Sequence, residues 1–297
     1  MVQRFSEAGG NNSKRTFEGL YRKFKLINAP TKGDISELWD NKEMLFSYNL
    51  STLSNHQFWS STLLQTISSN KNTSNEMLRE IGARANLTNI FSLDVLSSVV
   101  QNPNAENDTI SIVFAKCESN MLGTISYEIM RAIATNPKTD VSILEAMITK
   151  ILKLDGVYDE KNNSIYEADK SLEEINSIDT GPKAMPNEYS MLIKNSLRRS
   201  AKEEKSMAKS DLEKALDLVM AAVSNPNISE SAIEGVMFFA VLSSKREDST
   251  LNNLFLQLIV NPKVSIENLE FMSKAELSPV IKLIVNEELK NRWKNQR

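Results

Sequence analysis

An Asn-Pro pair constrains the fold of this chain more than any other feature, because it occurs four times and each time follows an apolar segment. The four pairs use half of the eight prolines in the 297 residues. A residue that precedes proline is disfavoured in the α region, whereas proline suits the turn after a helix. Each pair therefore predicts the end of one helix and the start of a turn. The pairs begin at Asn102, Asn136, Asn225 and Asn261.

The residues after each pair also repeat. Counting from the asparagine, position +4 carries Asp or Ser in three copies, and these residues favour the N-cap of a new helix. Positions +3 and +8 are then placed to form a hydrophobic staple across the start of that helix. Glu106 is the poor cap of the set, and Asp108 is the alternative cap for that helix. The three positions hold Ala105, Glu106 and Ile110; Thr139, Asp140 and Leu144; Ile228, Ser229 and Ile233; and Val264, Ser265 and Leu269.

The segments on both sides of these turns have helical periodicity, as in Leu122, Ile125, Ile129 and Ile133. The asparagines are 34 residues apart from Asn102 to Asn136, and 36 apart from Asn225 to Asn261. This length accommodates two helices and their turns. Weaker copies occur at residues 67–78 and 26–38. We therefore expect an all-α fold of about five or six helical pairs.

The order of apolar helix, Asn-Pro, short polar stretch and leucine-bearing helix resembles the repeats of α-solenoids, in particular the leucine-rich repeat variant and HEAT-like proteins. The resemblance covers residues 60–153 and 211–285, and it implies a right-handed α-solenoid. The accessory cysteine cluster of the leucine-rich repeat variant family is absent, since Cys117 is the one cysteine. The resemblance therefore implies no iron–sulfur function.

Composition and charge divide the chain into four parts. Residues 1–60 form an N-terminal basic segment with capping helices, and residues 61–154 hold helical repeats. Residues 155–210 break the pattern and read as a charged insertion or connector: residues 155–179 hold eight acids and two bases, and residues 194–209 hold six bases and two acids. Residues 211–297 hold further repeats and a basic C-terminal cap.

The sequence assigns no catalytic, cofactor-binding or metal-binding residue. His56 is the one histidine and has no partner constellation, so we interpret it as a packed or surface side chain. Cys117 has no activating motif and is interpreted as a small buried side chain. No phosphate-binding glycine loop is present. We therefore predict that the protein is not an enzyme and needs no cofactor, while an activity like that of HEAT-like DNA glycosylases stays open.

Three basic clusters are the candidate sites for binding a macromolecule. In the first and third, aromatic side chains interleave with the cations, as in phosphate-contacting and base-stacking surfaces. The alternative for residues 13–25, which we favour because the overall charge is acidic, is an amphipathic helix that docks Phe17, Leu20, Tyr21 and Phe24 on the repeats, with its charges in water. The candidate residues are Arg15, Arg22, Lys23 and Lys25; Arg198, Arg199 and Lys202; and Arg292 with Trp293.

The leading functional hypothesis is a nonenzymatic helical-repeat scaffold that binds another macromolecule. We favour a protein partner, since the net charge of −3 is not the basic balance of a dedicated nucleic-acid binder. Binding of nucleic acid through the basic clusters is the alternative. No apolar stretch is long enough to span a bilayer and no secretory signal precedes the fold, so we expect a cytoplasmic protein without a membrane partner. The oligomeric state is left open.

Overall fold

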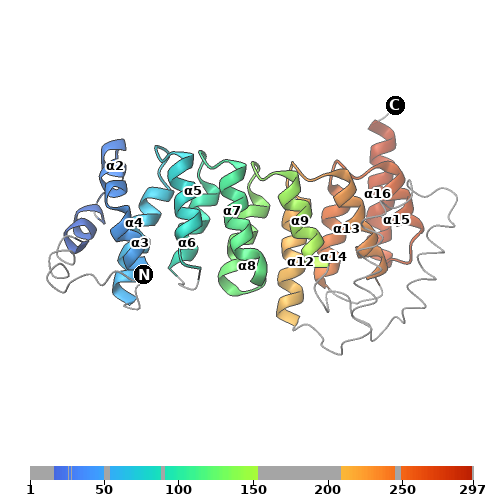
Figure 1. Cartoon of the computed structure of the whole chain (residues 1–297). Coiled ribbons are helices and arrows are strands. Elements are labelled where there is room, and N and C mark those ends of the chain that lie inside the picture. Colours follow the sequence, from blue (N-terminus) through green and yellow to red (C-terminus); the bar gives the residue numbers. More distant parts are fainter. Residues whose placement is uncertain are drawn as a thin grey trace. The chain divides into compact units, whose positions relative to one another are not determined.

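A computed structural model of the chain describes residues 17–25, 27, 29–49, 54–87, 91–152, 209–244 and 249–295 (Figure 1). These residues form helices joined by turns, and no strand occurs among them. The all-α class predicted from the sequence is confirmed for this part of the chain. The chain divides into two compact units, Met1–Lys138 and Thr139–Arg297, which we call unit 1 and unit 2.

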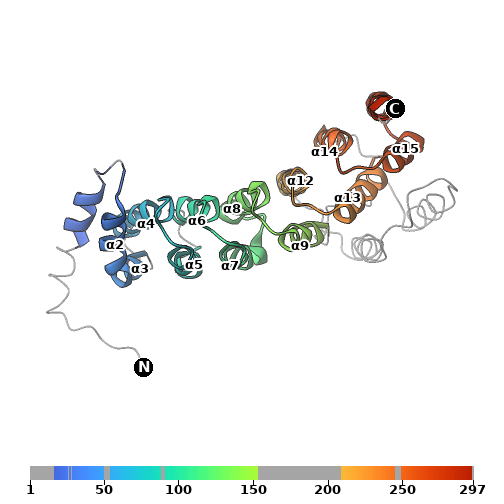
Figure 2. The ribbon, with the colours of Figure 1, turned by 90° about the horizontal axis from the view of Figure 1, so that it is seen from above.

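Unit 1 consists of helices that pack in two layers. Helices α4, α6 and α8 lie side by side in one layer, and α5 lies beside α7 in the other (Figure 2). A helix at residues 17–24 precedes α2. The elements are α2 (Lys32–Asp40), α3 (Lys42–Asn49), α4 (Ser54–Ser68), α5 (Asn75–Arg84), α6 (Ser92–Gln101), α7 (Asn107–Cys117), the 3₁₀ helix η1 (Glu118–Asn120) and α8 (Thr124–Thr135).

Unit 2 is built in the same way. Helix α14 lies between α12 and α16, while α13 contacts α9, α12 and α14, and α15 packs against α16. The elements are α9 (Val141–Leu152), α12 (Lys209–Val223), α13 (Glu230–Leu242), α14 (Ser249–Val260), α15 (Ile266–Lys274) and α16 (Pro279–Asn295). Helix α13 carries the sequence VMFFAVL at residues 236–242. Residues 236–241 of it are buried on every side, as an all-round apolar helix requires.

The helices end where the Asn-Pro pairs predict. Helices α6, α8 and α14 end one residue before the asparagine, and α12 ends two residues before it. At each site the backbone N–H of the asparagine donates to the carbonyl three residues earlier, which closes the last turn. Asn70, which lacks a following proline, makes the same bond to Ile67. We call each stretch from the asparagine to position +4 an Asn joint; the joints are residues 70–74, 102–106, 136–140, 225–229 and 261–265.

Position +4 of the joints caps the next helix as expected. Ser265 Oγ accepts the backbone N–H of Asn268 at 3.1 Å, and the serines of two other joints make the same bond. Glu106 occupies the N-cap of α7 without a side-chain cap, as predicted. The expected replacement, Asp108, stays within the first turn of α7. There it accepts a hydrogen bond from Asn75 of α5, whose side-chain oxygen also accepts the backbone N–H of Glu106. The start of α7 is therefore held by its neighbour α5.

The side chains at positions +3 and +8 are buried in every joint, in agreement with the predicted staple. Val264 and Leu269 are 1% and 0% exposed. Burying two such side chains contributes about 3–6 kcal/mol of hydrophobic free energy at one corner, before the cost of ordering the chain. Each joint is thus a capped and apolar corner.

The asparagine of a joint also bonds to the preceding joint or to the backbone beside it. Asn102 donates from Nδ2 to the carbonyl of Ser68 at 2.6 Å and to that of Asn70 at 2.9 Å, while its Oδ1 accepts the N–H of Asn104. Asn102 is 3% exposed, and its bond to the carbonyl of Ser68 is buried, whereas the carbonyl of Asn70 also accepts the backbone N–H of Thr73. In three other joints the asparagine Nδ2 likewise donates to a backbone carbonyl earlier in the chain: Asn70 to Pro30, Asn136 to Val100 and Asn261 to Val223.

Position +2 supplies a second set of bonds. Asn104 donates to the carbonyls of Lys71 and Thr73, and Lys263 donates to those of Pro226 and Ile228. Lys138 and Asn227 likewise donate to Pro103 and Thr139. Asn and Lys both carry N–H donors on a side chain that can reach the previous turn. The two sets form an asparagine ladder that links successive joints.

Candidate functional site

The N-terminal cluster lies on the helix at residues 17–24. Phe17 and Phe24 of this helix are 0% and 2% exposed, and Tyr21 stacks on Trp59 with ring centroids 5.1 Å apart. Arg22, Lys23 and Lys25 are exposed, and Lys23 pairs with Glu37 at 2.5 Å. The docked amphipathic helix, given above as the alternative, therefore describes this segment. Its cations face solvent, whereas its aromatic rings pack inside unit 1.

The other predicted binding residues fall into two groups. Arg15, Arg198, Arg199 and Lys202 lie outside the described residues. Arg292 and Trp293 lie near the end of α16. Trp293 is 46% exposed, so its indole ring is accessible.

Arg292 closes the end of the asparagine ladder in unit 2. Its guanidinium donates to the carbonyls of Ile259 at 3.1 Å and Asn261 at 2.9 Å, and also to the carbonyl of Val264. These carbonyls occupy the positions that an asparagine and a +2 side chain bind in the interior joints. Arg292 also pairs with Glu288 at 2.8 Å. One side chain thus takes over the bonds that a further joint would make, and its guanidinium faces inward.

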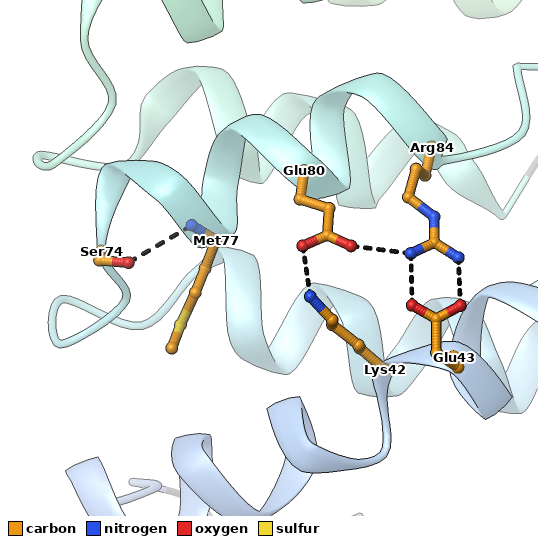
Figure 3. A network of polar contacts seen from close by, with 6 residues as sticks. All are labelled: Lys42, Glu43, Ser74, Met77, Glu80 and Arg84. Atoms are coloured by element: carbon orange, nitrogen blue, oxygen red, sulfur yellow. Dashed lines mark hydrogen bonds and ion pairs between the residues drawn. The ribbon is translucent and has the colours of Figure 1, made fainter.

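An ion-pair network joins α3 to α5 on the surface of unit 1 (Figure 3). Arg84 makes a bidentate pair with Glu43, with both N–O distances at 2.8 Å, and also bonds to Glu80. Lys42 donates to the second oxygen of Glu80 at 2.6 Å. Hydrogen bonds to Glu43 raise the pKa of Arg84, and the same bonds lower that of Glu43. Partial burial would raise the pKa of Glu80, but the bonds from Lys42 and Arg84 hold it below its ordinary value. The network is charged at neutral pH and fully paired, so it has the properties of a structural clamp.

The carboxyl groups of the described residues carry no sign of an acid catalyst. A general acid at neutral pH needs a raised pKa. Every described carboxyl group with a resolved pKa displacement is instead shifted downward, by hydrogen bonds that stabilise its charge. These groups are Asp34, Glu43, Glu80, Asp108, Asp140 and Glu287.

Three further ionisable side chains of unit 1, Cys117, Lys116 and His56, lie in structural surroundings. Burial raises the pKa of Cys117 to about 11, which leaves the thiol protonated. Burial lowers the pKa of Lys116, but its ammonium group donates to the carbonyls of Ala83 and Ala85 and so caps α5. His56 is 7% exposed among the rings of Phe17, Tyr48 and Trp59, and its Nδ1 has no hydrogen-bond partner. Among the described residues no cluster of His, Cys, Asp or Glu is placed to hold a metal ion.

Exposed apolar side chains occur as two pairs on two neighbouring helices of unit 2, one pair near the end of α14 and the other at the start of α16. Leu256 and Val260 lie one turn apart on α14, and Val280 and Leu283 lie three residues apart on α16. They are 37%, 67%, 66% and 63% exposed. On each helix they lie opposite the buried stripe, since residues three or four apart share a face. In the described part of unit 1, Phe58 is the large apolar side chain that is comparably exposed. These four side chains are the candidate binding residues of unit 2.

No protein-family model matches the chain, and no match to it was found among the curated proteins. No enzyme family therefore supports a catalytic role. The crystal structure of an engineered protein from a structural genomics consortium is similar at 13% identity, with a TM-score of 0.29. That comparison covers 92% of this chain and 84% of the other, and at this TM-score it supports no structural argument. Among the described helices, none combines the length and apolarity needed to cross a membrane.

Two features of the structure were missed by the sequence reasoning. The ladder was missed because the steric effect of proline explains the end of a helix whatever residue precedes it. The signal was present, since that residue is asparagine in every copy and position +2 is always Asn or Lys. The exposed apolar residues of α14 and α16 were missed because candidate binding residues were selected by basic charge and interleaved aromatic rings. Val260, Val280 and Leu283 fall outside the buried face on a helical wheel, which would have revealed them.

Proposed function

We propose that the protein is a nonenzymatic helical-repeat scaffold that binds a partner protein, with its helical pairs arranged as an α-solenoid. The single observation that carries the proposal is the set of exposed apolar residues on α14 and α16. We call Leu256, Val260, Val280 and Leu283 the apolar surface of unit 2. An array of helices whose polar side chains are used in the joints offers its outward faces for binding.

An amphipathic helix of the partner is the occupant that this surface fits. Helices α12, α14 and α16 pack side by side by burying stripes of Leu, Ile and Val, and a helix with such a stripe can add to them in the same way.

A pull-down with paired variants tests this proposal. Val280→Asp with Leu283→Asp places two carboxylates in the apolar surface, and the first lies in the opening turn of α16, where a negative charge is favourable to the helix. The control is Asn286→Asp with Asn291→Asp, which adds the same charge at exposed polar positions of α16. We expect the first pair to lose a partner that wild type and control retain, and that the purified partner binds wild type directly. Equal binding to all three chains would refute the proposal.

We rank protein binding ahead of nucleic-acid binding. The helix at residues 17–24 offers exposed cations, but Phe17 and Phe24 are buried and Tyr21 is already stacked on Trp59, so these rings are not free to stack on bases. Arg292 is engaged with backbone carbonyls. Binding of single-stranded DNA or RNA that weakens with added salt, and that is lost on changing Arg22 and Lys25 to Ala, would reverse this order.

A further inference from the structure

The +2 side chain of an Asn joint binds carbonyl groups of non-helical backbone. In four joints it donates to carbonyl groups of the preceding turn, and these bonds come from Asn104, Lys138, Asn227 and Lys263. The bound carbonyls lie in turns, where no backbone N–H of a helix is placed to donate to them. Such carbonyls require a donor, and the +2 side chain provides it.

The first joint breaks this rule. Its asparagine bonds normally, since Asn70 Nδ2 donates to the carbonyl of Pro30 at 2.8 Å and its Oδ1 accepts the N–H of Asn72. The +2 residue is Asn72, which is exposed. Within the described part of the chain the side chain of Asn72 makes no hydrogen bond. Among the described residues, a donor that is used in the other four joints is therefore unused in this one.

A groove lies at the same place. It has a volume of about 420 Å³, and Asn72 lines it together with Lys71, Thr66, Pro30 and Ile27. Its walls are the α4–α5 joint on one side and the segment that leads into α2 on the other. The groove thus combines an unused amide donor, a cation, a hydroxyl and two apolar side chains. Its lining contains no acidic residue and no aromatic residue, so it is suited neither to a metal ion nor to a stacked base.

We propose that this groove binds an extended peptide segment of a partner protein, whose backbone carbonyls accept hydrogen bonds from Asn72 Nδ2. The bound segment takes the place that a turn of the preceding joint takes in the rest of the ladder. An apolar side chain of the peptide packs against Ile27 and Pro30, and Lys71 favours an acidic residue beside it. The inference rests on the proposed function, since it names a second site on a protein-binding scaffold.

The test uses the full chain and a random heptapeptide library displayed on phage. Selected peptides are synthesised with a fluorophore, and their affinity is measured by polarisation. Asn72→Ala removes the donor and should weaken binding about fivefold, the effect of one hydrogen bond. Thr66→Trp fills the groove and should abolish binding. Asn107→Ala is the control, because Asn107 is an exposed asparagine of unit 1 that lies outside the groove lining.

A change in the peptide itself tests the role of the carbonyl. When one amide linkage of the selected peptide is replaced by an ester, the carbonyl oxygen of that linkage becomes a weaker hydrogen-bond acceptor. At the carbonyl that Asn72 binds, the replacement should weaken binding to wild type and have no further effect on Asn72→Ala. Circular dichroism checks that each variant is folded.

Two results would overturn the inference: recovery of no binding peptide, or peptides that bind wild type, Asn72→Ala and Thr66→Trp equally. Either result leaves the proposed function standing if a partner is still lost on mutation of the apolar surface of unit 2. Conversely, peptides that depend on Asn72 support the groove even if that partner is not found.

Discussion

The interior joint at Asn102 and the last joint at Asn261 satisfy the same kind of backbone group by different means. In unit 1 the carbonyls of the joint at residues 70–74 receive donors from two short side chains, Asn102 and Asn104, which belong to the next joint. In unit 2 the carbonyls of the last joint receive donors from Arg292, one long side chain on a helix. The difference shows that the carbonyl positions define the ladder, and that any donor of suitable reach can complete it.

The two solutions suit their places in the chain. Asparagine is short, and its Oδ1 accepts a backbone N–H of its own turn, as Asn102 accepts that of Asn104. Its Nδ2 is then free to donate to the carbonyls of the preceding joint. Arginine shapes no turn, but its planar fork carries five donors and can bind several carbonyls from one position. Beside the joint at residues 261–265, one arginine supplies the donors that two asparagines supply beside the joint at residues 70–74.

Removal of the interior asparagine should have the largest effect on stability. Asn102→Ala leaves the buried carbonyl of Ser68 without this donor and also removes the part-buried bonds to the carbonyl of Asn70 and the N–H of Asn104. Each unsatisfied buried group costs roughly 1–3 kcal/mol, and their effects overlap, so we expect a loss of about 3 kcal/mol. Urea unfolding followed by the fluorescence of Trp39 and Trp59 reports on unit 1. A loss below about 0.5 kcal/mol would contradict the role of the ladder, with Asn107→Ala as the matched control.

Removal of Arg292 should have a smaller effect on stability, confined to unit 2. Arg292→Ala removes a donor from three part-buried carbonyls, of which that of Asn261 still accepts the N–H of Val264. We expect a loss of about 2 kcal/mol. Arg292→Lys should recover part of it, because an ammonium group can bind one or two of the carbonyls. Hydrogen exchange of α14 to α16 by mass spectrometry measures the change, and exposed Asn291→Ala is the control; equal exchange in all four chains would argue against the closing role.

Helix caps provide the next comparison. Ser265→Ala removes a side chain that accepts the N–H of Asn268, and it should lower stability by about 1 kcal/mol. Glu106→Ala removes a residue at the same position of another joint whose side chain makes no cap bond, so it should change stability by less than about 0.5 kcal/mol. Thermal unfolding of both variants measures the difference. Equal losses would mean that position +4 acts through something other than capping.

The sequence was sufficient for those parts of the fold that depend on local rules. The helix ends at Asn102 and Asn261 follow from the restriction that proline imposes, and the cap at Ser265 follows from its spacing. Bonds between joints could not be derived in this way, because they join residues about 35 positions apart and depend on the packing of whole helices. Arg292 shows the limit most clearly: its charge suggested a binding residue, while its contacts are those of a closing residue.

The candidate surfaces were still less accessible to sequence reasoning. An exposed valine and a buried valine look alike in a sequence, and the two are separated only when neighbouring helices are in place. Val280 and Ile281 are adjacent, yet they are 66% and 3% exposed. The groove beside Asn72 depends on the approach of Pro30, 42 positions earlier, to the first joint. Such features belong to the packing of the unit and not to any single repeat.

The smallest expected effect concerns the charged clamp between α3 and α5, which holds helices together by ion pairs where the ladder uses amides. The folded pKa values of Glu43 and Glu80 are below the ordinary value of 4.5. A depressed pKa contributes stability that is present above the unfolded pKa and is lost as pH falls through the folded pKa. The clamp should therefore support unit 1 above about pH 4.5 and weaken below it, whereas the uncharged asparagine bonds should not change in this range. Because Glu80 is partly exposed, we expect Glu80→Gln to cost about 0.5–1 kcal/mol at pH 7. The difference between wild type and Glu80→Gln in urea unfolding should shrink between pH 4.5 and pH 3. A difference that stays constant over this range would show that the bond geometry, and not the charge of Glu80, carries the effect.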